Sequence, residues 1–339
     1  MIDQLWHTTW LPVSDQVAVS DWNDIYIYTI DFEQIDEIRI VENCVEEDIF
    51  DCLRILQMRW SPDERYFAVV LTNRSNSYLQ IWDFDSRQML HEFSTASMKT
   101  GAIFWSSDSS FVAFSTTHED NTAQIQLLNA LDGSIYHSFD YIHDDYYPLE
   151  VVWHPDSTEI VIISSPIEVW NIAQQSPVQI PISSLSADSV LWQKVVYNYD
   201  GSQMASIIQD EYQNIFQIDV WDRTTREILF SYENDTLPVE RIWWHRDWII
   251  TIAGSDNEEH ERNFFWRIWD SKTGELITEY LFPRGVNAQI NETHGRLQAL
   301  YIDTRVNEPV IHNAYTGEIT SFLSRETQPC EEQYVQPCE

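Results

Sequence analysis

Apolar and polar residues alternate through most of the chain, as in the stretch "FFWRIWDSKTGELITEY" (264–280). Its first half alternates apolar and polar residues and ends at Trp269-Asp270. A Ser-Lys-Thr-Gly segment follows, and then a second alternating run begins. An alternation with period two is typical of β-strands. Gly274 stands where a tight turn tolerates a positive φ. The stretch therefore predicts a β-hairpin.

The same hairpin pattern recurs along the chain at intervals of about 40 to 55 residues, a period that indicates a repeat architecture. Each copy is aligned on an anchor residue at the end of its first alternating run. The anchors are Tyr28, Trp82, Leu128, Trp170, Trp221, Trp269 and His312.

A second marker precedes each anchor: an apolar run that ends in an aromatic residue, with Ile290 replacing the aromatic residue in the last copy. The aromatic markers are Trp10, Trp60, Trp105, Trp153, Tyr197 and Trp244. Five of them are followed three residues later by an aspartate, namely Asp63, Asp108, Asp156, Asp200 and Asp247. Another short strand pattern follows each marker. Each repeat is therefore expected to contain four strands, with no helix between them.

These residues resemble the WD-repeat β-propeller family over roughly residues 5 to 323. The Trp-Asp pair stands at Trp82, Trp221 and Trp269, and Trp170 is followed by Asn171. The resemblance implies an all-β, seven-bladed β-propeller with four antiparallel strands per blade. We expect a single domain over 1–323 and a cysteine-containing tail over 324–339. Two features depart from the family: its Gly-His dipeptide is absent, and glycine is scarce, with 8 in the chain.

Ring closure is the point at which the sequence and the family differ. WD-repeat propellers usually close by sharing one blade between the two termini, which removes an exposed sheet edge. Here the first blade begins with its innermost strand near Leu5, and the seventh finishes its outermost strand near Phe322. Closure by the packing of whole blades, with the tail over the seam, is therefore expected.

The charge of the chain excludes several classes of partner. It carries 19 basic and 55 acidic residues, a net charge of −36, and this field repels nucleic acid and anionic membranes. No run of 18 apolar residues is present, so direct membrane insertion is not expected. The first residues show no signal-peptide pattern. The acids form a solvated surface that also suits a protein with a basic or mixed surface, or a divalent cation.

The four cysteines form two segments of identical spacing, "CVEEDIFDC" and "CEEQYVQPC". The simplest connectivity joins Cys44 to Cys52 and Cys330 to Cys338. Disulfides persist in oxidising compartments, so the predicted disulfides favour an extracellular or periplasmic location. Four reduced thiols in a cytoplasmic protein are the alternative. The wide spacing, with no paired histidines nearby, argues against zinc.

In the family, the turns between first and second and between third and fourth strands share the bottom face, and the other loops share the top face. Applied here, this rule gives short bottom turns and longer, acidic top loops. Long loops on a rigid scaffold often bind partners, and aromatic residues within a charged rim are typical of such surfaces. The predicted partner-binding residues are Glu46, Glu47, Asp48, Phe50, Tyr141, Asp144, Asp145, Tyr146, Tyr147, Asp256, Glu258 and Glu259. The alternative is that these loops are only solvated and variable and bind no partner, and this alternative is favoured for 254–263.

No catalytic motif is visible, and neither a cofactor nor a metal site is predicted. The chain has no glycine-rich phosphate loop, nucleophile elbow or His-Glu-x-x-His motif. His154, His245 and His294 follow the strand markers and are expected to be structural. The clusters 143–145 and 259–261 could each supply metal ligands, but neither completes a site alone. We therefore expect a non-enzymatic protein-interaction scaffold, with an extracytoplasmic sensor of small ligands, glycans or cations as the alternative.

Overall fold

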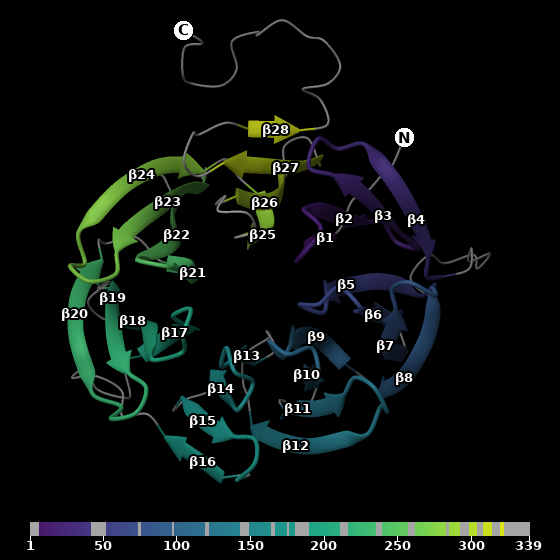
Figure 1. The fold of residues 1–339 in the computed structure, drawn as a ribbon, viewed down its shortest axis with the longest axis horizontal. Helices are drawn as coiled ribbons and strands as arrows, with labels where there is room; N and C mark the ends of the chain where they lie inside the picture. Colours follow the sequence, from purple (N-terminus) through teal and green to yellow (C-terminus); the bar gives the residue numbers. More distant parts are fainter. Residues whose placement is uncertain are drawn as a thin grey trace, which may run out of the picture.

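The structure, a computed structural model, describes residues 7–41, 52–73, 76–96, 98–118, 122–142, 149–163, 167–174, 176–179, 190–210, 216–234, 239–256, 262–282, 285–291, 298–303, 308–313 and 319–321. Every regular element in these ranges is a β-strand. The strands form seven four-stranded antiparallel sheets. The sheets surround a common axis as the blades of a propeller, with the first strand of each blade innermost and the fourth outermost (Figure 1).

The first four blades contain β1 (His7–Leu11), β2 (Gln16–Ser20), β3 (Asp24–Thr29), β4 (Gln34–Arg39); β5 (Arg54–Trp60), β6 (Tyr66–Thr72), β7 (Asn76–Asp83), β8 (Gln88–Ala96); β9 (Met98–Trp105), β10 (Phe111–His118), β11 (Thr122–Asn129), β12 (Ile135–Ile142); and β13 (Glu150–Trp153), β14 (Glu159–Ile163), β15 (Glu168–Asn171), β16 (Ser176–Gln179). The last three contain β17 (Val190–Tyr197), β18 (Gln203–Asp210), β19 (Phe216–Asp222), β20 (Ile228–Asn234); β21 (Val239–His245), β22 (Trp248–Asp256), β23 (Arg262–Asp270), β24 (Leu276–Phe282); and β25 (Gly285–Asn291), β26 (Gln298–Asp303), β27 (Glu308–Asn313), β28 (Ile319–Ser321).

The core of the molecule lies between the blades. The second strands are buried on both faces because each sheet packs between two others, and β6, "YFAVVLT", is buried at every position but its last. The outermost strand β4 is mostly exposed. The interface of blades one and two is typical: Leu11 and Ile27 of the first blade pack with Met58 and Phe67 of the second. The sequence anchors and markers fall on the third and first strands, as predicted.

Blades one and seven close the ring without exchanging a strand. Each described sheet consists of four consecutive strands, as the sequence predicted. Trp10, Val17 and Tyr28 of the first blade pack with Leu300 and Ile311 of the seventh. Burial of these side chains, rather than a shared sheet, therefore joins the two ends of the ring. The tail 324–339, which was expected to cover the seam, lies outside the described residues.

The fourth strand carries the same β-bulge in five blades. The pairing of third and fourth strands shifts by one residue at the anchor position of blades one, two, three, five and six. The residue that bulges out is large, apolar and exposed in every case: Ile35, Leu90, Tyr136, Leu229 and Ile277. A bulge increases local twist and interrupts pairing. The repeated bulge therefore protects the outer edges from pairing with other strands.

The tight turns of the blades explain how the chain manages with few glycines. Five first-to-second strand turns place a non-glycine residue at positive φ: Asp15 (52°), Glu64 (59°), Ser109 (62°), Ser157 (60°) and Arg246 (52°). In the fifth blade the same turn contains Gly201, with a φ of 71°. Side chains in this conformation cost roughly 1–2 kcal/mol each, and glycine avoids that cost. Glu64, Ser109, Ser157 and Gly201 each lie four residues after the marker of their blade, and each main-chain N–H donates to the carbonyl oxygen three residues before it. Blades two to five therefore share one turn geometry, although glycine occupies it only in the fifth.

Candidate functional site

Partner-binding residues were predicted in the loops assigned to the top face. Two of these residues are described, and the structure places both in strands: Tyr141 near the end of β12, and Asp256 as the last residue of β22. The strands are longer than expected because the backbone pairing continues to Ala123↔Tyr141 and to Asp256↔Arg262. The other predicted residues lie outside the described residues: Glu46, Glu47, Asp48, Phe50, Asp144, Asp145, Tyr146, Tyr147, Glu258 and Glu259.

Tyr141 joins two blades. Its hydroxyl donates a hydrogen bond to Glu168 Oε2 of the fourth blade at 3.0 Å. Trp170 Nε1 donates to the same oxygen at 3.0 Å. Burial and the Glu168 carboxylate both raise the pKa of the Tyr141 phenol, which stays protonated and keeps donating at neutral pH. The described contacts of Tyr141 therefore give it a structural role at the edge of the top face.

Cys52 lies just before β5 and is disulfide-bonded. Its partner lies outside the described residues, as do Cys44, Cys330 and Cys338. The pairings Cys44–Cys52 and Cys330–Cys338 stay predictions.

The bottom face carries hydrogen bonds that link the turns of successive blades. Asp63 N donates to Ser109 Oγ at 3.1 Å, which joins blades two and three. In the same way Asp108 N donates to Ser157 Oγ at 3.0 Å, which joins blades three and four. Both acceptor serines have a positive φ. The sequence showed the aspartates but not their bonds, because the partner lies one whole repeat away.

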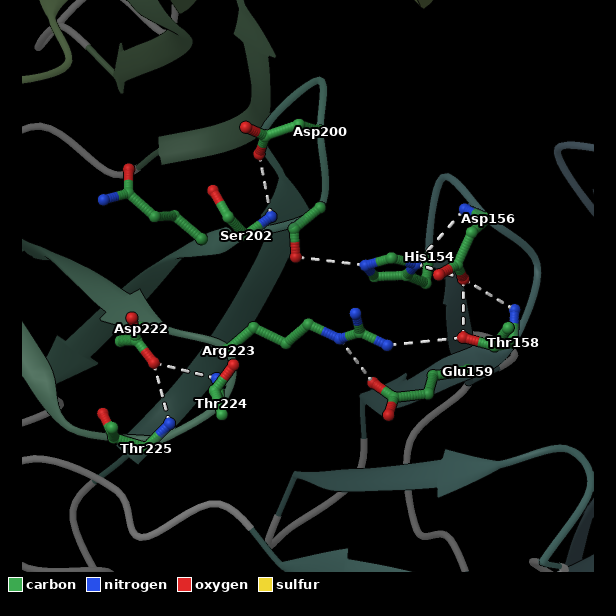
Figure 2. Close-up of polar contacts among 12 residues, drawn as sticks. His154, Asp156, Thr158, Glu159, Asp200, Ser202, Asp222, Arg223, Thr224 and Thr225 are labelled. Atoms are coloured by element: carbon green, nitrogen blue, oxygen red, sulfur yellow. Dashed lines mark hydrogen bonds and ion pairs between the residues drawn. The ribbon is translucent and has the colours of Figure 1, made fainter.

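Polar side chains also link blades four and five (Figure 2). Arg223, from the turn after β19, reaches across to the fourth blade. Its Nε pairs with Glu159 Oε2 at 3.1 Å, and its Nη2 donates to Thr158 Oγ1 at 3.3 Å. Its own turn is ordered by Asp222, which accepts hydrogen bonds from the main-chain N–H groups of Thr224 and Thr225 at 2.9 and 2.7 Å. Arg223 therefore ties one ordered turn to the next blade.

His154 stands beside this contact, and both of its ring nitrogens are engaged. Nδ1 pairs with the Asp156 carboxylate of its own turn, and Nε2 lies 3.0 Å from the main-chain oxygen of Gly201 in the fifth blade. The side chain is buried, with 1% of its surface exposed. A general base needs a free nitrogen that a substrate can reach. His154 lacks one and has the structural role that the sequence predicted.

Asp156, by contrast, is half-exposed. Partial burial opposes its ionisation, but hydrogen bonds from the Thr158 side chain and main chain and from His154 outweigh it. Together they lower the pKa of the Asp156 carboxyl to about 2. Asp156 is therefore ionised at neutral pH and accepts these hydrogen bonds.

The Trp-Asp pairs have a similar structural role. Trp221 Nε1 donates to Ser206 Oγ at 2.8 Å, and Trp269 Nε1 donates to Thr251 Oγ1 at 3.0 Å. In both cases the acceptor lies on the neighbouring second strand of the same blade. These two blades thus contain a Trp–Ser/Thr hydrogen bond without the Gly-His dipeptide of the family.

The innermost strands carry a set of polar residues that the sequence reasoning missed. His7, Gln57, Glu150, Lys194 and Arg241 each lie three residues before the marker of their blade, so the repeat places them at one level around the axis. We call them the axial ring. A repeat alignment could have found them, because the position is fixed relative to Trp10, Trp60, Trp153, Tyr197 and Trp244.

The described residues contain no group of three or more His, Cys, Asp or Glu side chains arranged to hold a metal ion. The clusters 143–145 and 259–261, considered as ligands above, lie outside them. In the same part of the chain, no helix is long and apolar enough to cross a membrane.

Comparisons with known proteins identify the fold. No family model and no curated protein matches the sequence. The C-terminal WD40 domain of Sif2 superposes with a TM-score of 0.61 at 14% identity, covering 93% of this chain and 82% of that one. A chain of the mitotic checkpoint complex gives 0.57 at 15% identity, covering 84% and 80%. At these identities the likeness establishes the fold alone: the chain has the WD40-type β-propeller fold that its repeats predicted.

Proposed function

We propose that the protein is a non-enzymatic scaffold that binds another protein through the top face of its propeller. The observation that carries this proposal is the closed WD40-type ring of four-stranded blades. One similar structure is a chain of the mitotic checkpoint complex, which is an assembly of proteins. Since fold alone does not determine function, the proposal needs a site, and the top-face loops supply the candidate.

The bottom-face hydrogen bonds explain how the ring could present such loops. They hold the turns of neighbouring blades in register, so the opposite ends of the same strands have fixed positions. Binding residues on a rigid frame lose less conformational entropy when a partner docks. The net charge of −36 favours a partner surface that is basic or mixed.

The proposal places the contact on acidic and aromatic residues of the top loops, with Tyr146 and Tyr147 at its centre. Tyrosine is enriched among the residues that dominate binding energy in interfaces. The test is affinity capture from native extract with wild type and a Tyr146→Ser/Tyr147→Ser variant as baits. The matched control is Leu229→Ser/Ile277→Ser, which removes two exposed apolar residues from the outermost strands.

A protein that is retained by wild type and control but lost from the tyrosine variant supports the proposal. Equal retention by all three baits refutes the top-face assignment, and a protein lost only from the control moves the site to the outermost strands. All three baits should unfold at similar temperatures, so that a loss of capture reports binding rather than folding.

We also propose that the protein works outside the cytoplasm, and that its cysteines pair locally. The disulfide bond of Cys52 supports this, since such bonds persist in oxidising compartments. Peptide mapping of protein from its native source, without reducing agent, should show Cys44 linked to Cys52 and Cys330 linked to Cys338. Four alkylated thiols would refute both the pairing and the location.

A further inference from the structure

The large apolar side chains that stay exposed lie on one side of the ring. Among the described residues, each of them lies in a bottom turn or among the first three residues of a fourth strand, which begins at the bottom face. They are Val13, Ile35, Met89, Leu90, Leu131, Ile135, Tyr136, Tyr199, Ile228, Leu229, Leu276 and Ile277. The β-bulge accounts for the fourth-strand residues, which leaves Val13, Leu131 and Tyr199 in the turns. Single exposed apolar residues are common, but their gathering on one side indicates an interaction surface.

Tyr199 is the most exposed of these residues, at 85%. It lies in the turn from β17 to β18, at the bottom of blade five. The turn is ordered by its own side chains. Asn198 Oδ1 accepts a hydrogen bond from Gln203 N at 3.0 Å, and Asp200 Oδ1 accepts one from Ser202 N at 2.9 Å. An aromatic ring on an ordered turn can bind a partner at a small cost in conformational entropy.

This turn belongs to a continuous frame at the bottom of blades one to five. The Glu64 carboxylate of blade two accepts a hydrogen bond from Ser14 N of blade one at 2.7 Å. The bonds described above continue the chain as far as blade five: Asp63–Ser109, Asp108–Ser157 and His154–Gly201. Because the first strands are innermost, these turns surround the axis of the ring (Figure 1). A partner therefore meets one rigid surface rather than separate loops.

Three turns of this frame carry an apolar residue followed directly by an aspartate: Pro62-Asp63, Pro155-Asp156 and Tyr199-Asp200. The turns of blades four and five lie next to one another (Figure 2). All three aspartates are exposed. The described hydrogen bonds to their carboxylates all end on Oδ1, so the second oxygen of each is left for another donor.

The charge of these turns determines the kind of partner that fits them. Hydrogen bonds from the Ser202 side chain and main chain lower the pKa of Asp200, and the pKa of Asp156 is about 2, as described above. Both carboxylates are therefore ionised at neutral pH. A second copy of the chain on this surface would bring like charges together, and anionic lipids would be repelled too. A cationic segment of another protein is complementary to it.

We propose that the bottom turns of blades two to five bind a protein through a segment in which basic and apolar side chains alternate. Tyr199 packs against the apolar side chains of that segment. Asp63, Asp156 and Asp200 pair with its lysines or arginines. Tyrosine and arginine are enriched among the residues that dominate binding energy in interfaces. The site lies away from the loops assigned to the top face and goes beyond the proposed function, because the propeller then joins two proteins.

The test is fluorescence anisotropy of labelled peptides titrated with the full chain at constant ionic strength. Three peptides of equal length are compared: alternating Arg and Leu, alternating Arg and Ser, and alternating Glu and Leu. The Arg–Leu peptide should bind and the Glu–Leu peptide should not. The Arg–Ser peptide should bind at least about tenfold more weakly than the Arg–Leu peptide, because it supplies the charges without the apolar contacts.

Two variants of the protein test the two kinds of contact. Tyr199→Ser should weaken the Arg–Leu complex at least about tenfold, since interface tyrosines often dominate binding. Asp63→Asn/Asp200→Asn should weaken it by a similar factor, because the ion pairs are lost while asparagine keeps an oxygen for the hydrogen bonds of each turn.

The matched controls change exposed residues on the outer side of blades five and six. Leu229→Ser/Ile277→Ser removes apolar surface, and Glu227→Gln/Glu275→Gln removes two negative charges. Both controls should bind the Arg–Leu peptide like wild type. Tyr146→Ser/Tyr147→Ser should do so too, which separates a failure of this inference from a failure of the top-face proposal.

Failure of the Arg–Leu peptide to bind wild type overturns the proposal. Equal binding by Tyr199→Ser also overturns it, because the affinity is then a general attraction of a cationic peptide to an acidic protein. Sedimentation of the protein alone and flotation with phosphatidylcholine vesicles test the other occupants. A dimer or vesicle binding that Tyr199→Ser abolishes would assign the surface to a second copy or to lipid instead. Because Tyr199 is exposed, Tyr199→Ser should melt like wild type, so a weaker complex reports binding.

Discussion

Replacing Gly201 with alanine should break the His154 contact between the fourth and fifth blades. Gly201 has a φ of 71°, and an added Cβ would lie 2.0 Å from His154 Nε2 and 2.4 Å from its Cε1. The His154 ring is buried, so it cannot turn into solvent. Alanine must therefore displace the ring from its contacts with Gly201 and Asp156.

The cost can be estimated in three parts. The left-handed conformation costs a non-glycine residue roughly 1–2 kcal/mol. Loss of the His154–Gly201 hydrogen bond adds about 1 kcal/mol. Crowding of a buried side chain adds about 1–3 kcal/mol. The free energy of unfolding should fall by about 3–6 kcal/mol, measured by urea titration with tryptophan fluorescence.

Gly133→Ala is the matched control. Gly133 has nearly the same φ, 70°, and an added Cβ would meet His91 Nδ1 at 2.5 Å. His91 is only partly buried, so its ring can move away and the expected cost is roughly 1–2 kcal/mol, from the conformation alone. Equal losses in the two variants would refute the role assigned to His154.

Three further predictions concern the turns and the core. The pKa of Asp156 is about 2 in the folded protein, below its ordinary 3.8, so the ionised carboxylate stabilises the fold fully above about pH 4 and loses this effect as the pH falls through 2. Between pH 4 and 2, the free energy of unfolding of Asp156→Asn should therefore fall less than that of wild type, as measured by urea titration. Trp221→Phe removes the hydrogen bond to Ser206 Oγ and should lower the free energy of unfolding by about 1–3 kcal/mol. In a double-mutant cycle with Ser206→Ala, the loss of stability in the double variant should be smaller than the sum of the two single losses. Arg226 has a φ of 61°, so Arg226→Gly should raise the free energy of unfolding by about 1 kcal/mol. A decrease in the free energy of unfolding would refute the argument from turn strain.

The sequence was sufficient to predict the repeats, because the apolar alternation and the Trp anchors are local signals. It also predicted closure by whole blades, since the first strand of blade one is innermost. The turn conformations were hidden because residues such as Glu64 and Arg87 occupy positive φ without glycine. A turn motif based on glycine could not find them.

The site was harder to predict than the fold. Tyr141 and Asp256 were assigned to loops because polar residues follow them, but main-chain pairing continues regardless of side-chain polarity. Glu150 and Lys194 lie far apart in sequence, and only the packing of their blades brings them into an ion pair. Such groupings depend on the stacking of the blades, which no local pattern encodes.

The claim that the protein is a scaffold is tested most directly by the affinity of one purified partner. Once capture has identified that partner, its dissociation constant should be measured by calorimetry against wild type, Tyr146→Ser/Tyr147→Ser and Leu229→Ser/Ile277→Ser. The account predicts a complex of fixed stoichiometry that weakens at least about tenfold in the tyrosine variant alone, since central interface tyrosines commonly contribute about 2 kcal/mol or more. Equal affinity for all three proteins, or no measurable complex with wild type, would contradict it.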